Sequence, residues 1–293
     1  MLGFMRRQPS CFPPALLLAA LLLAALPARA ATLVFSGVVV DQGSNRYLDR
    51  FTQWLAARAD IPLKPVYVES YRALSDHLRA HPKDIAWTCG APFVQDRLHD
   101  GQQLVAVPLF KGQPLYHSVI ITSARRAREQ SLADFRGGVF AYADPRSNSG
   151  FVAPAHEMAR RGLNIQGHFR YLLRTGLHEH TIRAVLDGLA DVGAVDEYVL
   201  VEYEKQHPDA KRRLRVVERL GPYPFTPIVA GRDAPADQIA RLQRALTAMR
   251  EDAEGRAILR DLGLDGFVVR PVSFYAPIAA MLGLSLDARA PGR

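Results

Sequence analysis

The chain has 293 residues, with 37 Lys and Arg against 29 Asp and Glu, and a formal net charge of +8. Three of these positive charges, Arg6, Arg7 and Arg29, lie in the first thirty residues, which hold no acid, so the remainder carries +5. This mild excess favours small anions as ligands. Nucleic acid is disfavoured as a partner, because the basic residues are scattered and do not alternate with aromatic residues in one stripe.

The first thirty residues have the order of a secretory signal peptide. Arg6 and Arg7 precede an apolar run over 15–26, and a small-residue sequence ends at Ala30. The run is short for a membrane span of ~20 residues. We therefore expect residues 1–30 to be removed, with cleavage near Ala30, to give an exported soluble protein. Cys89 is then the only cysteine, so no internal disulfide can form.

Strand-like and helix-like segments alternate in the first third of the mature chain. Apolar, β-branched runs predict strands over 32–40, 63–68 and 85–88, and apolar residues on one face predict helices over 47–59 and 71–80.

The same order returns later in the chain. A helix carrying Ile182, Val185, Leu186 and Leu189 on one face precedes a strand over 192–195. Repeated β-α-β order indicates parallel sheets with helices on both faces, and therefore an α/β fold.

Two stretches, 113–121 and 221–225, are the natural places for the chain to cross between two lobes. They predict a discontinuous lobe 1 over 31–115 plus 224–285, and an inserted lobe 2 over 116–223. Two-lobed clamps close about such paired connections. The sequence therefore predicts a ligand cleft between the lobes.

The segment YADPRSNSGF, residues 142–151, places polar residues between a strand and a helix predicted over 151–161. Ser147, Asn148 and Ser149 offer side-chain donors, Gly150 permits close approach of the backbone, and N–H groups at a helix start attract anions. This arrangement suits a tetrahedral oxyanion. An ordinary helix cap, in which Ser149 serves only its own helix, is an equal alternative.

Three further residues are candidates for ligand contact. His178 precedes a helix and can donate to an anion, although such a residue is more often a polar loop side chain. Asp196 and Glu197 follow the strand over 192–195, at the carboxyl end where open α/β sheets bind ligands. A carboxylate there suits a ligand with an acidic proton or an amine, while a plain surface acid is the alternative.

The patterns for catalysis and for metal or cofactor binding are missing from the sequence. The serines lack the G-x-S-x-G elbow, and their order with His178 and Asp196 matches no familiar triad. No cysteine cluster or nucleotide-type glycine loop is found. We therefore expect a protein that is not an enzyme and that uses no metal or cofactor.

Four motifs in order resemble the PhnD-like phosphate, phosphite and phosphonate substrate-binding proteins of ABC transporters, which are type II periplasmic binding proteins. They are Y-x-A-L…D-I-A-W-x-x-G-A-P-F-V over 71–94, YHSVIIT from Tyr116, SLADFRGGVFAYADPRSNSG over 131–150, and GLHEHTIRAVLDGLADVGAVDEY over 176–198. The resemblance spans about 32–268. It implies a two-lobed periplasmic protein, a monomer, that captures a small phosphorus oxyanion for an inner-membrane permease.

The resemblance also implies roles for residues. The oxyanion would be held by Ser147, Asn148 and Ser149, His178 would donate to an oxygen, and Asp196 or Glu197 would face the protonated or amine-bearing side of the ligand. Tyr71 and Tyr116 would close the cleft. Asn148 replaces a usual threonine and Leu177 a frequent serine, which leaves the identity of the oxyanion open.

One alternative keeps the same fold and ligand but changes the partner. A ligand-sensing module would present the bound anion to a membrane receptor or a sensor kinase, where a transport protein would present it to a permease. Neighbouring genes for a permease and an ATPase, or for a kinase, distinguish the two.

Overall fold

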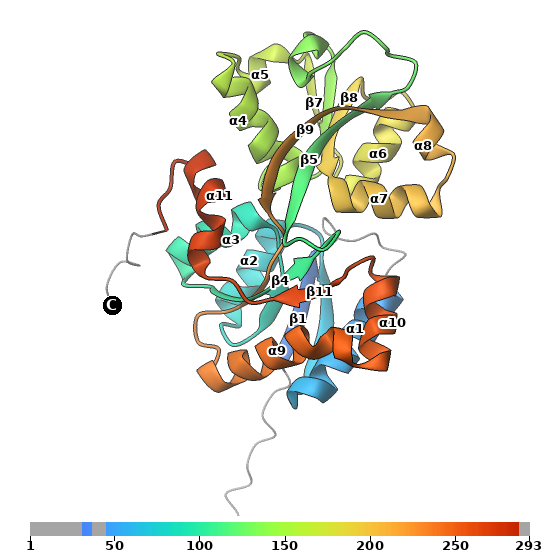
Figure 1. Cartoon of the computed structure of the whole chain (residues 1–293). Coiled ribbons are helices and arrows are strands. Elements are labelled where there is room, and N and C mark those ends of the chain that lie inside the picture. Colours follow the sequence, from blue (N-terminus) through green and yellow to red (C-terminus); the bar gives the residue numbers. More distant parts are fainter. Residues whose placement is uncertain (1–30, 37–44, 287–293) are drawn as a thin grey trace, which may run out of the picture.

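The computed structural model describes residues 31–36 and 45–286, which form two α/β lobes, each built on its own sheet (Figure 1). The strand predicted over 32–40 appears as β1, Ala31–Ser36, and its last four residues lie outside the described residues. Within the described ranges, no helix is long and apolar enough to cross a bilayer.

Lobe 1 contains a six-stranded mixed sheet in the order β11-β4-β10-β3-β1-β2. β1 pairs in parallel with β2 and β3, whereas β10 runs antiparallel between β3 and β4, and β11 pairs antiparallel with β4. The other strands are β2 (Leu63–Val68), β3 (Ile85–Trp87), β4 (Gln103–Leu109), β10 (Ile228–Ala230) and β11 (Gly266–Val268). Residues from both ends of the chain therefore share one sheet.

Lobe 1 has six helices among the described residues, of which five surround its sheet and the sixth, α11, packs on α3 (Figure 1). They are α1 (Asn45–Ala59), α2 (Tyr71–Ala80), α3 (Gly90–Asp100), α9 (Ala236–Ala248), α10 (Ala253–Asp261) and α11 (Ala276–Met281), with the short 3₁₀ turns η4 (Met249–Glu251) and η5 (Val272–Tyr275). The bounds predicted for β2 and α2 agree with those observed. Trp87 anchors the core, where its ring lies 5.9 Å from Phe51 and 6.3 Å from Phe267.

Lobe 2 contains a five-stranded mixed sheet in the order β7-β6-β8-β5-β9. β6 pairs in parallel with β7 and β8, and β5 pairs antiparallel with β8 and β9. The strands are β5 (Leu115–Ser123), β6 (Val139–Tyr142), β7 (Tyr171–Arg174), β8 (Val192–Asp196) and β9 (Leu214–Pro224). The chain passes between the sheets at 110–114 and again at 225–227.

Helices cover both faces of the second sheet, and the strands supply an apolar layer to each (Figure 1). Along β5, Val119 and Ile121 enter one layer and Ile120 enters the other, as the two-residue period of a strand requires. The helices are α4 (Ala153–Arg160), α5 (Ile165–His168), α6 (His178–Leu186), α7 (Glu197–Gln206) and α8 (Ala210–Arg213), with a 3₁₀ turn η2 (Leu132–Phe135).

Two predicted helices differ from the observed ones. Leu189 was expected on the buried face of a helix, but α6 ends at Leu186 and Leu189 is 67% exposed. Gly188 ends the helix because it adopts φ +73°, a left-handed conformation that glycine tolerates.

The helix expected over 151–161 is preceded by a π-helical turn, η3 (Asn148–Val152), and α4 starts only at Ala153. Pro154 has no N–H group, so it cannot donate to the carbonyl four residues earlier. The Ala153 N–H donates to the Asn148 carbonyl, five residues earlier. This wider turn includes most of the segment 147–150, the anion loop, which the sequence predicts to hold an oxyanion.

Candidate functional site

The loop over Ser147–Gly150 lies at the contact between the two lobes, at the carboxyl end of β6. Its two serines and its asparagine are 0% exposed. Ser147 caps the turn, because its Oγ accepts from the Gly150 N–H at 3.0 Å. Ser118 of the neighbouring β5 donates its Oγ to the Ser149 carbonyl at 2.6 Å. The loop is therefore fixed by its own sheet before any ligand is considered.

Three buried polar atoms in and beside this loop have no hydrogen-bond partner: Ser149 Oγ, Asn148 Oδ1 and His178 Nδ1. Leaving a buried donor or acceptor unpaired costs about 1–3 kcal/mol. Three such atoms in one place point to a bound group that completes their hydrogen bonds. The Ser149 hydroxyl therefore does not cap the following helix, a role that Ser147 Oγ fills instead.

His178 starts α6 and lies against the loop. Its Nε2 is 3.4 Å from Ser147 Oγ, and a Cβ added to Gly150 would lie 3.3 Å from its Cε1. Burial lowers the pKa of His178 to about 3, so the imidazole is neutral at pH 7, with one nitrogen protonated. A larger residue at position 150 would press on both Ser147 and His178, which would have to shift by a few tenths of an ångström.

Asp196 and Glu197 are neighbours in sequence but lie in different surroundings. Asp196 is 4% exposed and caps α7 by accepting from the Tyr198 N–H at 2.8 Å. Burial raises the pKa of Asp196 to about 7. Burial is also the main cause of the raised pKa values of the Tyr71 and Tyr116 phenols, and the charge of Asp196 adds to it. Asp196 therefore faces the same buried cluster as the two predicted tyrosines.

Glu197 points instead to the connection between the lobes. Its carboxylate accepts from Lys111 Nζ at 2.9 Å and bonds His117 Nδ1 at 2.8 Å, while Arg219 Nε lies 4.0 Å away. These contacts hold the Glu197 carboxylate at the connection between the lobes. Of the two acids, the structure therefore brings only Asp196 to the loop.

Tyr116 and Tyr71 complete the cluster from β5 and from lobe 1. The Tyr116 hydroxyl accepts from Asn148 Nδ2 at 3.0 Å, which orients that amide with its oxygen unpaired. Tyr71 begins α2 and is 1% exposed. Burial raises the pKa of both phenols well above the usual value, so each hydroxyl remains protonated and can donate.

Lobe 1 adds residues that the sequence reasoning did not include. Cys89 is buried at the start of α3, and its Sγ accepts from the Asn148 N–H at 3.3 Å, across the lobe boundary. Thr88 Oγ1 is buried and has no partner. Both residues directly follow β3, so the rule that indicated Asp196, polar residues after a strand, would have found them.

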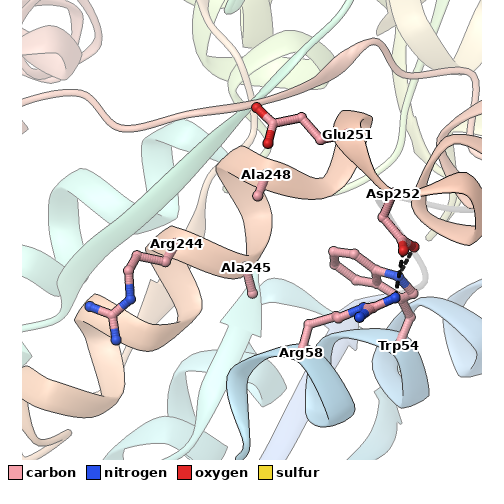
Figure 2. A pocket seen from close by; sticks show the side chains of 7 residues that line it. All are labelled: Trp54, Arg58, Arg244, Ala245, Ala248, Glu251 and Asp252. Atoms are coloured by element: carbon pink, nitrogen blue, oxygen red, sulfur yellow. Dashed lines mark hydrogen bonds and ion pairs between the residues drawn. The ribbon is translucent and has the colours of Figure 1, made fainter.

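The pocket shown in Figure 2 is separate from this cluster. It has a volume of about 390 Å³ and lies among α1, α9 and η4 of lobe 1. Trp54 Nε1 and Arg58 Nη2 both donate to Asp252, which caps α10. Asp252 and Asp196 both cap a helix, but Asp252 also pairs with Arg58, whereas Asp196 has no basic partner among the contacts of the described residues.

Among the described residues, no three His, Cys, Asp or Glu side chains gather in a way that could hold a metal ion. The cluster instead offers hydroxyl groups, an amide, a neutral imidazole and one acid. Such a set can hold a small oxyanion through hydrogen bonds without a cation.

Comparisons with known proteins agree with this geometry. The family described as ABC transporter, phosphonate, periplasmic substrate-binding protein matches residues 38–270. No curated protein sequence matches the chain. A binding protein component of an ABC phosphonate transporter from Pseudomonas aeruginosa is similar in structure, with a TM-score of 0.77, 21% identity and 86% of each chain covered.

Two further solved structures share the fold. PhnD1 from Prochlorococcus marinus, in complex with methylphosphonate, has a TM-score of 0.77 at 20% identity, covering 87% of this chain and 98% of its own. A Xanthomonas citri protein bound to ATP has a TM-score of 0.67 at 19% identity, over 87% and 98%. The fold thus accommodates different phosphorus anions, and the ligand must be argued from the site.

Proposed function

Because the chain belongs to the family of periplasmic substrate-binding proteins of phosphonate ABC transporters, we propose that it binds one small phosphorus oxyanion between its lobes and delivers it to an inner-membrane permease. Methylphosphonate, phosphite and phosphate are the candidate ligands, together with aminoethylphosphonate. The protein acts as a monomer after removal of its first thirty residues near Ala30.

The observation that carries this proposal is the group of unpartnered buried atoms: Ser149 Oγ and His178 Nδ1 can donate to an anion, while Asn148 Oδ1 can only accept and so suits a proton or an amine of the ligand. The Ser149 and Ser147 hydroxyls and the neutral His178 ring donate to the anion, and the first turn of η3 and α4 adds the positive end of a helix dipole. Tyr71 donates from lobe 1. Hydrogen bonds to a charged group contribute about 1.5–3 kcal/mol each, so a few of them account for micromolar affinity, about −8.2 kcal/mol.

Asp196 gives the site a preference among anions. A buried carboxylate repels a fully ionised ligand, but it accepts a hydrogen bond from a ligand that carries a proton or an amine. Hydrogen phosphate, hydrogen phosphonates and aminoethylphosphonate satisfy this condition near pH 7. Sulfate carries no proton there, so it should bind more weakly than these anions once Asp196 is ionised, above pH about 7.

The test is a thermal-shift and calorimetric titration with methylphosphonate, phosphite, phosphate, aminoethylphosphonate and sulfate. We expect one phosphorus anion to bind at a 1:1 ratio and, at a hundred times its dissociation constant, to stabilise the fold by about 2.7 kcal/mol. Sulfate serves as the control of equal shape. The proposal fails if none of the four phosphorus anions shifts the melting temperature.

The family is one of transport proteins, and we propose that this chain likewise binds and releases its ligand unchanged. The titrated solutions, analysed by phosphorus NMR after prolonged incubation, should contain only the ligand that was added. A new phosphorus species that forms with the unmutated protein but not with Ser147→Ala would refute this.

A further inference from the structure

Arg146 directly precedes the anion loop and is anchored to it through the backbone. Its N–H donates to Asp144 Oδ1 at 2.7 Å, and the Ser147 N–H donates to the Asp144 carbonyl at 3.0 Å. Any displacement of Arg146 therefore reaches Ser147.

The Arg146 side chain leaves lobe 2 and ends on two helices of lobe 1. Its Nε donates to Gln95 Oε1 at 3.1 Å, its Nη1 to Ser75 Oγ at 2.7 Å and its Nη2 to Asp96 Oδ1 at 2.6 Å. Ser75 belongs to α2, and the other two belong to α3. A guanidinium with three ordered acceptors makes a specific contact of fixed geometry.

Asp96 depends on this contact for its charge. Its side chain is 6% exposed, and its other donors are neutral, the Ser75 hydroxyl at 2.5 Å and the Gln102 amide at 3.2 Å. Burial raises the pKa of Asp96, and the charge of Arg146 opposes that shift. When the lobes separate, Arg146 leaves and a buried carboxylate loses its cation, which is unfavourable.

The two helices that Arg146 contacts also carry the site residues of lobe 1. Tyr71 is the first residue of α2, and Cys89 immediately precedes α3. Through its contacts with α2 and α3, Arg146 fixes the position of the anion loop relative to Tyr71 and Cys89.

We propose that Arg146 is a positioning residue that latches the two lobes together and so sets the rate of ligand release. This role rests on the proposed function, because the latch encloses the oxyanion bound to Ser147–Gly150. Since its contacts exist only when the lobes meet, they favour the closed arrangement selectively. The latch slows dissociation and leaves the association rate, which reflects open lobes, unchanged.

The test compares Arg146→Ala and Arg146→Lys with the unmutated protein. Lysine keeps the positive charge beside Asp96 but lacks the planar guanidinium group. Arg146→Lys therefore still tests the contact if Arg146→Ala does not fold. The matched control is Arg174→Ala. Arg174 Nη2 also binds Asp144, at 3.2 Å, but both partners lie within lobe 2.

Two quantities are measured for each protein. The separation of the lobes is obtained by pulsed electron resonance between spin labels at Asp60→Cys and Arg212→Cys, whose native side chains are 100% and 77% exposed. Dissociation and association rates of methylphosphonate are obtained by stopped flow.

We expect Arg146→Ala to lower the population of the short distance, with and without methylphosphonate, and to speed dissociation about ten- to a hundredfold. Arg146→Lys should fall between, and Arg174→Ala should change neither quantity.

Unchanged distances and rates in Arg146→Ala overturn the latch, and so does an equal loss in Arg174→Ala. If the unmutated protein binds no methylphosphonate, that part of the proposed function fails, and the distance distributions alone decide for or against the latch.

Discussion

The two lobes bring different chemistry to their shared site. Lobe 2 supplies Ser149, Asn148 and His178, each with a buried polar atom that has no partner, together with Asp196, which no basic side chain neutralises among the described contacts. Lobe 1 supplies one unpartnered atom, Thr88 Oγ1, together with the Tyr71 ring and the Cys89 thiol, and the thiol already accepts from lobe 2. We therefore expect most of the ligand recognition to come from lobe 2, and lobe 1 to contribute mainly to closure.

Asp196→Asn tests the lobe 2 side and should have the largest effect. With the pKa of Asp196 at about 7 in the folded state against 3.8, the folded protein keeps a proton between these values that the unfolded chain has lost. Raising the pH therefore favours unfolding, by about 1.4 kcal/mol per unit and about 4 kcal/mol in all. Asparagine preserves the helix cap. Urea unfolding at several pH values should therefore show this change in the difference between the unmutated protein and Asp196→Asn, because the opposite contribution of buried His178 is common to both.

The neighbouring acid provides the control for that measurement. Burial tends to raise the pKa of Glu197, but its bonds to Lys111 and His117 outweigh burial and leave the pKa below its usual value. The stability that Glu197 contributes is therefore present above pH ~4.5 and lost as pH falls. This pH dependence is opposite in sign to that of Asp196. Parallel pH profiles for Asp196→Asn and the unmutated protein would contradict the assignment.

Ser149→Ala should have the next largest effect, on affinity alone. Its Oγ has no partner, so the ligand-free protein should keep its stability, whereas ligand binding loses about 1.5–3 kcal/mol, roughly 10- to 150-fold. Calorimetry with the best phosphorus anion measures the loss.

Thr122→Ala is the matched control for Ser149→Ala. Thr122 Oγ1 is buried in the same lobe but already donates to Asp191, so its loss should cost stability and leave affinity unchanged. If Ser149→Ala binds as tightly as the unmutated protein, recognition does not depend on this loop hydroxyl.

Tyr71→Phe tests the lobe 1 side and should have the smallest effect. The variant keeps the ring and loses only the hydroxyl, so the binding free energy should weaken by about 0.5–1.5 kcal/mol. The loss should appear as faster dissociation, with an unchanged association rate. Tyr275→Phe is the control, because Tyr275 donates to the Phe225 carbonyl within lobe 1. A slower association rate in Tyr71→Phe would place Tyr71 in recognition and weaken the contrast between the lobes.

Local patterns predicted the elements that depend on short-range periodicity. The bounds of β2 and α2 agree with the prediction, as does the α/β class of both lobes. The loop over Ser147–Gly150 was also visible, because a polar cluster between a strand and a helix is a local signal.

Contacts between residues that lie far apart in the chain could not be predicted from the sequence. Arg146 and Asp96 lie fifty residues apart, and nothing in either segment indicates that they meet. The separation of Asp196 from Glu197 depends on Lys111 and His117, which a strand-end rule does not see. The late start of α4 was missed because the effect of Pro154 was not applied.

The position of β10 has a consequence for the order in which the molecule assembles. Lobe 2 is one continuous segment and can fold as soon as β9 has emerged. The sheet of lobe 1 cannot, because β10 lies between β3 and β4 and arrives only at Ile228–Ala230. The sheet of lobe 1 therefore stays incomplete between β3 and β4 until β10 pairs with both strands. The site between the lobes should accordingly form last, after the C-terminal segment has been made.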